Sequence, residues 1–323
     1  MLKQISLLIL CAAAIVWFAT PVQACTSAVV SGKVTPDGRP LLWKNRDTDF
    51  MQNHIDYVKG EKYNFIAVVN SANAYLKEAW MGTNSSGFAL MNTQSYNLVD
   101  VKGDEERGAA NGRVIYRALE VCATVEDFCH FLDTISKPSD IEANFGVIDA
   151  QGGAAMFEVD YHKYVMYDAN NPKDAPYGYI ARTNFSFAGK VNEGAGYVRY
   201  MEADQVLMKA SATGSITPQF IFNDLSRSFR NRMLDIDLRS GAYNRPQASG
   251  WFVDQDFIPR SSTSCSVVVQ GVKPGEKAEL TTMWTLLGYP PTGIAIPLWV
   301  KDAGKLLPGM VRFGKEHEAA PVS

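Results

Sequence analysis

An apolar leader followed at once by a cysteine restricts this sequence more than any other feature. A mostly apolar run covers residues 5–18, and Val22 and Ala24 match the small residues that precede a signal-peptide cleavage site. The pattern predicts that residues 1–24 are a signal peptide that is cleaved on export. The mature chain would then begin at Cys25, and the folded protein is expected to start there.

Cleavage after Ala24 would give Cys25 both a thiol and a free α-amine. A thiol attacks as its thiolate, and an ordinary cysteine titrates at about 8.5. An α-amine titrates at about 7.7–8.0, so it can take the proton of a thiol nucleophile at mild pH. Two other interpretations exist, because Cys25 could carry a lipid that blocks the amine or could form a disulfide. The bulky, polar Gln23 departs from the usual lipoprotein pattern.

The residues after Cys25 predict a β-hairpin. Residues 26–44 form two runs rich in Val, Thr and Leu around the turn signal Pro36-Asp37-Gly38. A short hairpin returns the chain beside its own start, so Arg46 and Asp49 are expected near Cys25. A cation there would favour the thiolate, and a carboxylate could hold the terminal amine. The alternative is that both charges belong to a solvated turn.

These residues resemble the start of the cysteine N-terminal-nucleophile hydrolases. The similarity rests on the Cys25-Thr26-Ser27 start, the Asp-Gly turn and the R-x-x-D motif from Arg46 to Asp49. The groups that it resembles most are the choloylglycine hydrolase and penicillin V acylase family and the isopenicillin-N acyltransferase family. In those enzymes the terminal cysteine attacks an amide carbonyl, and the arginine and aspartate assist it. The resemblance implies these roles for Cys25, Arg46 and Asp49.

Three later segments extend the resemblance. Residues 83–93 are similar to the N-E-x-G-L-A strand of the family, which implies an oxyanion donor at Asn92 or at the backbone of its neighbours Met91 and Thr93. Arg182-Thr183-Asn184-Phe185 looks like the family's T-N motif, which implies a second donor at Asn184. Residues 196–200 are similar to S-x-R-F/Y without the serine, which implies a site role for Arg199. The other interpretations are a strand end, a turn and a helix surface, respectively.

Composition excludes several classes of function. The chain has 323 residues, of which 46% are hydrophobic, enough for a large core. Its 31 basic and 34 acidic residues give a net charge of −3, which does not favour nucleic acid as a partner. After residue 24 no apolar run reaches the roughly 18–20 residues that a membrane span needs. We therefore expect a secreted or periplasmic protein with no membrane span; the sequence is compatible with a homo-oligomer.

The histidines and the remaining cysteines argue against a metal site or a Cys-His enzyme. None of the four histidines lies in a motif, and neither C-x-x-C nor a His-Cys cluster occurs, so no metal or cofactor is expected. Cys122 and Cys129 would lie about 10 Å apart on one straight helix, too far for a disulfide. Thr124 and Asp127 can start a second helix, so a disulfide across a bend and two free thiols both remain open.

The hydrophobic patterns predict an α+β fold. Two antiparallel sheets are expected to pack face to face with helices outside, in one domain over residues 25–323. The resemblance implies the four-layer αββα sandwich of the N-terminal-nucleophile hydrolases. Strands are expected at Phe65–Asn70, Tyr75–Met81, Phe88–Gln94, Phe145–Asp149, Ala154–Val159, Lys163–Tyr167, Tyr179–Thr183, Ser264–Gln270, Leu280–Leu287 and Gly293–Val300. Helices are expected over about 111–136, 196–212 and 217–230, with an irregular segment to about Arg260.

These observations predict an exported amidohydrolase that cleaves a linear, small-molecule amide. Cys25 would attack the carbonyl and form an acyl-enzyme thioester, which water would release. An acyltransferase of the isopenicillin-N type is the alternative within the same chemistry. A non-enzymatic exported lipoprotein or binding module, with Cys25 lipidated, is the alternative of another class.

Overall fold

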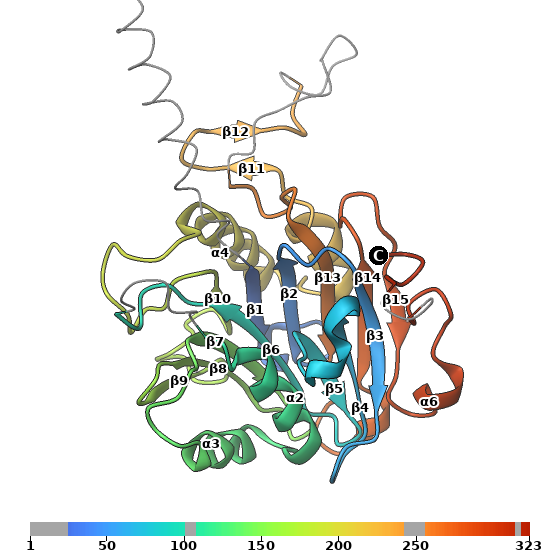
Figure 1. The fold of residues 1–323 in the computed structure, drawn as a ribbon. Helices are drawn as coiled ribbons and strands as arrows, with labels where there is room; N and C mark the ends of the chain where they lie inside the picture. Colours follow the sequence, from blue (N-terminus) through green and yellow to red (C-terminus); the bar gives the residue numbers. More distant parts are fainter. Residues whose placement is uncertain (1–24, 101–107, 242–255, 314–317) are drawn as a thin grey trace, which may run out of the picture.

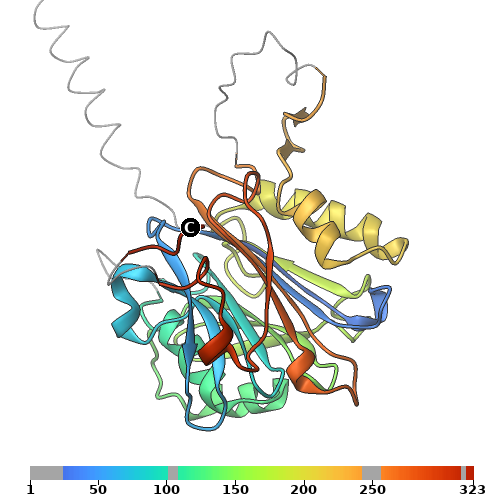
Figure 2. The same ribbon diagram turned by 90° about the vertical axis from the view of Figure 1, so that its right-hand side faces the viewer.

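Two antiparallel sheets stack face to face, with helices on the outer face of each (Figures 1 and 2). This computed structural model describes residues 25–100, 108–241, 256–313 and 318–323. The six strands of the first sheet, in spatial order, are β10 (Tyr179–Arg182), β1 (Thr26–Val30), β2 (Leu41–Asp47), β13 (Thr263–Gln270), β14 (Thr282–Leu287) and β15 (Ile296–Leu298). The seven strands of the second sheet follow sequence order: β3 (Asn53–Val58), β4 (Phe65–Asn70), β5 (Met81–Asn84), β6 (Ala89–Gln94), β7 (Ala143–Ile148), β8 (Ala154–Val159) and β9 (Tyr164–Asp168).

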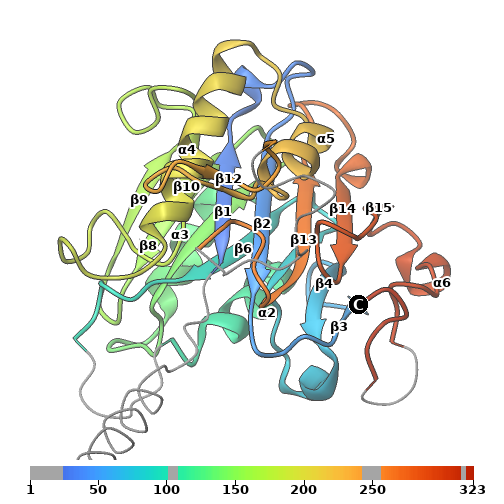
Figure 3. The same cartoon turned by 90° about the horizontal axis from the view of Figure 1, so that it is seen from above.

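The helices form the two outer layers. Helices α2 (Asn111–Val121) and α3 (Val125–Thr134) pack on the second sheet, whereas α4 (Tyr197–Ala212) packs on the first. Figure 3 shows α4 lying over β10 and β1. The shorter elements are α5 (Pro218–Phe220), a π turn at Ile221–Leu225, the hairpin β11 (Arg230–Asn231) and β12 (Ile236–Asp237), and α6 (Ala303–Leu306). None of the described helices is long and apolar enough to span a membrane.

Side-chain alternation along the strands separates three hydrophobic layers. On β2, Leu42 points into the core between the two sheets, whereas the next residue, Trp43, points toward α4. On β6, Leu90 faces α2 and α3, and Met91 faces the other sheet. Each sheet is therefore buried on both faces. The predicted four-layer αββα architecture is confirmed.

Two predicted elements are wrong. The run Tyr75–Met81 is no strand, because residues Ser71–Leu76 form a 3-10 turn, Lys77 adopts a left-handed φ of 53° and β5 begins only at Met81. Tyr75 did not signal burial, since it is 71% exposed. The helix expected over 217–230 ends in the π turn at Leu225, and Ser226 then hydrogen-bonds to the first sheet.

Two further differences concern strand β3 and the expected helix 111–136. Strand β3 was not predicted, although it pairs with β4 over its whole length. The helical region is divided at Thr124, and the predicted second helix start is confirmed, because the Thr124 hydroxyl accepts the Asp127 amide in a capping box. The thiols on either side of this break, Cys122 and Cys129, are both free, so the disulfide alternative is excluded.

The capping box gives a stability prediction. Thr124→Ala removes the side-chain acceptor at the start of α3 and should lower the free energy of unfolding by about 1 kcal/mol. Thr134→Ala is the matched control, because Thr134 only returns a hydrogen bond to Phe131 at the exposed end of the same helix. Urea unfolding of both variants measures the difference. Equal stability of the two variants would contradict a stabilising role for the cap.

Candidate active site

Cys25 lies immediately before β1, which is the second strand of the first sheet, between β10 and β2. Its side chain is 7% exposed, and its Sγ lies 3.8 Å from the backbone oxygen of Asp47. Strands β1 and β2 pair with Thr26 opposite Asn45. The hairpin therefore returns the end of β2 beside Cys25, as the turn signal between them implied.

Arg46 points from β2 into the space between the two sheets. Its Nη1 donates to Asn53 Oδ1 at 2.5 Å and its Nη2 to Asn70 Oδ1 at 2.7 Å, and the guanidinium lies 4.8 Å from the Trp80 ring centre. Burial lowers the pKa of Arg46, although the nearby Cys265, Cys25 and Asp47 act in the opposite direction. The structure thus brings Arg46 near Cys25, with its hydrogen bonds directed to the second sheet.

The structure does not bring Asp49 to this group. Asp49 is exposed and lies beyond the end of β2, whereas Asp47 is buried beside Cys25. The carboxylate of Asp47 accepts from Thr263 Oγ1 at 2.5 Å and from Arg260 Nε at 3.1 Å. Burial raises the pKa of Asp47 to about 6, against the opposing charges of Arg260 and Arg199. Asp47 therefore occupies the place that the sequence pattern gave to Asp49.

Lys44 is a second buried cation that the sequence pattern missed. Its Nζ donates to Asn92 Oδ1 at 2.9 Å and to the Trp80 carbonyl at 3.0 Å, across the gap between the sheets. Burial lowers the pKa of Lys44 to about 8, and the charge of Cys25 acts against that shift. The sequence signal was available, because Lys44 and Asp47 have the same spacing as Arg46 and Asp49. Through Lys44, the structure also connects Asn92 to the site.

Arg199 connects Cys25 to Asn184. Its guanidinium is 1% exposed and donates from Nη1 to the Cys25 carbonyl at 2.7 Å and to Thr26 Oγ1 at 3.0 Å. Its Nη2 donates to Asn184 Oδ1 at 3.0 Å, and Asn184 Nδ2 donates to the Gln94 carbonyl at 2.8 Å. The side chain of Asn184 is therefore fixed from both ends.

Gly196 explains how Arg199 fits at the head of α4. Gly196 has a φ of 83°, a left-handed conformation that favours glycine. A Cβ at this position would lie 2.3 Å from Arg199 Nη2 and 2.9 Å from the Thr183 Cβ. The glycine thus allows the helix to begin close enough for Arg199 to reach both Cys25 and Asn184.

Tyr96 is another residue within electrostatic range of Cys25 that sequence reasoning missed. It lies two residues after β6, and burial raises the pKa of its phenol; the charge of Cys25 raises it further, whereas Arg199 and Arg260 act to lower it. These interactions place the Tyr96 hydroxyl in the electrostatic environment of the site. Its position just beyond Asn92 was the only sequence signal for it.

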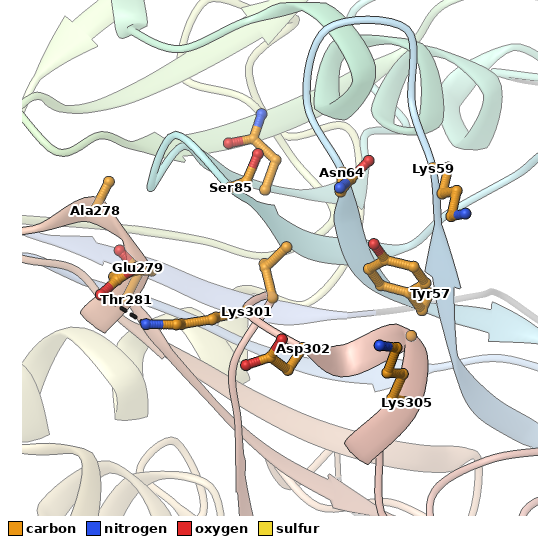
Figure 4. A pocket seen from close by; sticks show the side chains of 13 residues that line it. Tyr57, Lys59, Asn64, Ser85, Ala278, Glu279, Thr281, Lys301, Asp302 and Lys305 are labelled. Carbon is orange, nitrogen blue, oxygen red and sulfur yellow. Dashed lines mark hydrogen bonds and ion pairs between the residues drawn. The ribbon is translucent and has the colours of Figure 1, made fainter.

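A separate cavity of about 750 Å³ lies at the other end of the sandwich (Figure 4). Its lining includes Tyr57 and Lys59 from the β3 end, Thr281 before β14, and Lys301 and Lys305 near α6. Strands β13 and β14 run from the Cys25 end, where Cys265 pairs with Leu287, to the cavity end, where Gln270 pairs with Thr282. This cavity is therefore not part of the group around Cys25.

Several solved structures of known proteins show a distant similarity to this chain. Penicillin V acylase from Agrobacterium tumefaciens is similar in structure with a TM-score of 0.41 and 15% identity, over 81% of this chain and 82% of that chain. A variant of conjugated bile acid hydrolase from Clostridium perfringens has a TM-score of 0.48 and 13% identity, over 84% and 92%. The Caenorhabditis elegans ortholog of N-acylethanolamine-hydrolyzing acid amidase has a TM-score of 0.42 and 16% identity, over 62% and 89%. These likenesses are too distant to assign any residue a role.

Comparison of the sequence with protein-family models is more specific than these structural likenesses. A search among curated proteins returned no match. The family model described as acyl-coenzyme A:6-aminopenicillanic acid acyl-transferase matches residues 34–211, more than half of the chain, beginning after Cys25 and β1. The resemblance to the cysteine N-terminal-nucleophile hydrolases is thereby confirmed, and the chain belongs to the acyl-coenzyme A:6-aminopenicillanic acid acyl-transferase family.

Proposed function

We propose that this protein is an exported amidohydrolase that cleaves a linear amide with Cys25 as its N-terminal nucleophile. The observation that carries the proposal is the pair of contacts from Arg199, which holds the Cys25 backbone and the Asn184 side chain at once. Family membership supports acyl chemistry in general. The proposal includes cleavage after Ala24, which would free the α-amine of Cys25 and export the mature protein out of the cell or to the periplasm.

In this mechanism the thiol of Cys25 gives its proton to its own α-amine and attacks the amide carbonyl. A carbon–sulfur bond forms and the carbonyl π electrons move onto oxygen, which gives a tetrahedral oxyanion. When the intermediate collapses, the carbon–nitrogen bond breaks and the α-ammonium returns the proton to the leaving amine. Water then attacks the thioester, releases the acid and restores the thiol.

The surrounding charges suit these steps. Lys44 and Arg46 lie on the face of β2 toward the second sheet, where positive charge favours the Cys25 thiolate. Asp47 lies on the opposite face, where Arg199 also reaches the Cys25 backbone. A carboxylate in that position can hold the α-amine. Asn184 is the proposed oxyanion donor, and Asn92 is a candidate for the second.

Acyl transfer is the second candidate function. The matched family is described as an acyl-transferase, which favours release of the thioester by an amine in place of water. The two reactions share every step to the thioester. Product analysis with and without an added amine acceptor separates them, because a transferase forms a new amide and a hydrolase forms only the free acid.

The free amine gives the first test of function. A mature protein with one additional alanine before Cys25 should lose at least about 100-fold in kcat/KM, because its amine is acylated and cannot take the thiol proton. The measurement uses a panel of acyl amides that includes penicillin V and conjugated bile acids. Mass spectrometry of the active form shows its first residue. Full activity of the extended protein, or a diacylglycerol adduct on Cys25, would disprove the terminal-amine mechanism and favour the lipoprotein alternative.

Variants of Asp47 and Asp49 test which of the two carboxylates holds the α-amine of Cys25. Asp47→Asn should lower kcat/KM by roughly 100-fold, because its carboxylate holds the amine, whereas Asp49→Asn should have little effect. In the unchanged protein, kcat/KM should fall as the pH drops through about 6, since Asp47 then takes a proton. The opposite ranking of the two variants would restore Asp49 to the proposed role.

Variants of Asn184 distinguish a role in stabilising the oxyanion from a role in supporting the fold. If its amide stabilises the oxyanion, Asn184→Asp should lower kcat and kcat/KM together by about 100–1,000-fold with little change in KM. Asn184→Ala should do less harm, because water can partly replace the amide. Thermal unfolding is measured beside the rates. A lower unfolding midpoint with an unchanged kcat would show that Asn184 only supports the turn after β10.

A further inference from the structure

We propose that Arg260 is a positioning residue for Cys25, because it joins the β2 side of the site to the α4 side through Asp256. This inference rests on the proposed function. Arg260 lies just before β13 and far from Cys25 in the sequence, and no motif points to it. Its role follows from contacts that only the folded chain brings together.

The guanidinium of Arg260 contacts two carboxylates, those of Asp47 and Asp256. Its Nε donates to Asp47 Oδ2 at 3.1 Å, and its Nη2 lies 3.1 Å from the same oxygen. Its Nη1 donates to Asp256 Oδ1 at 3.1 Å. Asp256 Oδ1 also accepts from Arg199 Nε at 2.7 Å. One carboxylate oxygen of Asp256 therefore joins the two arginines.

These contacts close a ring that begins and ends at Cys25. The carbonyl of Cys25 accepts from Arg199, which pairs with Asp256; Asp256 pairs with Arg260, and Arg260 pairs with Asp47. The backbone oxygen of Asp47 lies beside the Cys25 sulfur. The nucleophile is thus fixed on two sides by one continuous set of contacts. Loss of the Arg260 link would remove one cationic partner from each of Asp47 and Asp256 and would open the ring between them.

The backbone at Asp256 supports a specific role for this link. Asp256 has a φ of 59°, in the left-handed region that non-glycine residues seldom occupy. Such conformations persist when surrounding contacts hold them, and they occur often at functional sites. Here the left-handed turn directs the carboxylate to both arginines. The side chains of Asp256 and Arg260 are 32% and 16% exposed, so they form the outer part of an otherwise buried ring.

The charges of the ring balance, with two guanidinium groups against two carboxylates. Four parts of the fold contribute the titratable and charged groups around Asp47. They are Cys25 beside β1, Lys44 and Arg46 on β2, Arg199 on α4, and Asp256 and Arg260 before β13. The Thr263 hydroxyl also donates a hydrogen bond to the Asp47 carboxylate. Removing Arg260 would leave one guanidinium for two carboxylates. Negative charge near Cys25 would then disfavour the thiolate, and Asp47 would keep its proton to a higher pH.

The test compares Arg260→Gln, Arg260→Lys and the control Arg232→Gln. Arg232 forms another ion pair to α4, through Glu202, and contacts neither Asp47 nor Asp256. The rate of Cys25 alkylation by iodoacetamide is followed against pH by peptide mass spectrometry, with the free thiol of Cys129 as internal reference. In Arg260→Gln, the midpoint of the Cys25 profile should move up by about half a pH unit or more.

The acidic limb of kcat/KM should move in the same direction in Arg260→Gln, with kcat lowered at least about tenfold at neutral pH and little change in KM. Arg260→Lys keeps the charge but cannot reach both carboxylates equally well, so it should restore the pH profile and only part of the rate. A profile for Arg260→Gln that matches Arg232→Gln would overturn the positioning role. If no amide in the panel is cleaved but the alkylation profile still moves, the proposed function fails and the positioning role stands.

Discussion

The buried guanidinium of Arg199 is the contact on which the site depends. It lies at the head of α4 and donates to groups from β1 and from the segment after β10, and it pairs with Asp256 before β13. These partners are distant in sequence, so their relative positions are set through one side chain. A buried charge that loses its partner typically costs about 3–5 kcal/mol, so such an arrangement tolerates little rearrangement. The left-handed glycine at position 196 is the local condition that lets α4 begin so close to Cys25.

Sequence reasoning predicted the architecture well because it depends on periodicity. The alternation of apolar residues identified most strands, and the helical spacing identified α2, α3 and α4. It failed where local composition and tertiary environment disagree. Tyr75 looked like part of a strand but is solvent-exposed, and the helix after residue 217 stops where Ser226 finds partners on the first sheet.

Sequence reasoning predicted most of the side chains that gather around Cys25, but it expected the carboxylate at Asp49, whereas the structure has Asp47 beside Cys25. A hairpin from Cys25 to the charged end of β2 follows from the turn residues. The pair Arg46 and Asp49 and the pair Lys44 and Asp47 share one spacing and differ by two residues. Since side chains in a strand alternate with a period of two, such a shift leaves every side chain on the same face. The sequence pattern alone could not choose between Asp47 and Asp49. The structure does, because β2 ends at Asp47 and Asp49 lies beyond the strand. Arg260, Asp256 and Tyr96 could not be found in this way, because the tertiary fold alone brings them to Cys25.

The position of β2 between β1 and β13 has a consequence for how the protein matures. Strand β1 is made first, but Thr263 pairs with Asp47 across a separation of 216 residues, and Arg260 reaches the same carboxylate from just before β13. A nascent chain that has reached α4 can hold Cys25 and Arg199 but still lacks both of these ligands of Asp47. The contacts around Cys25 and Asp47 are therefore complete only after the chain has been synthesised beyond Thr263. Until then Asp47 lacks two of the partners that the finished fold gives it, and the surroundings of Cys25 stay incomplete.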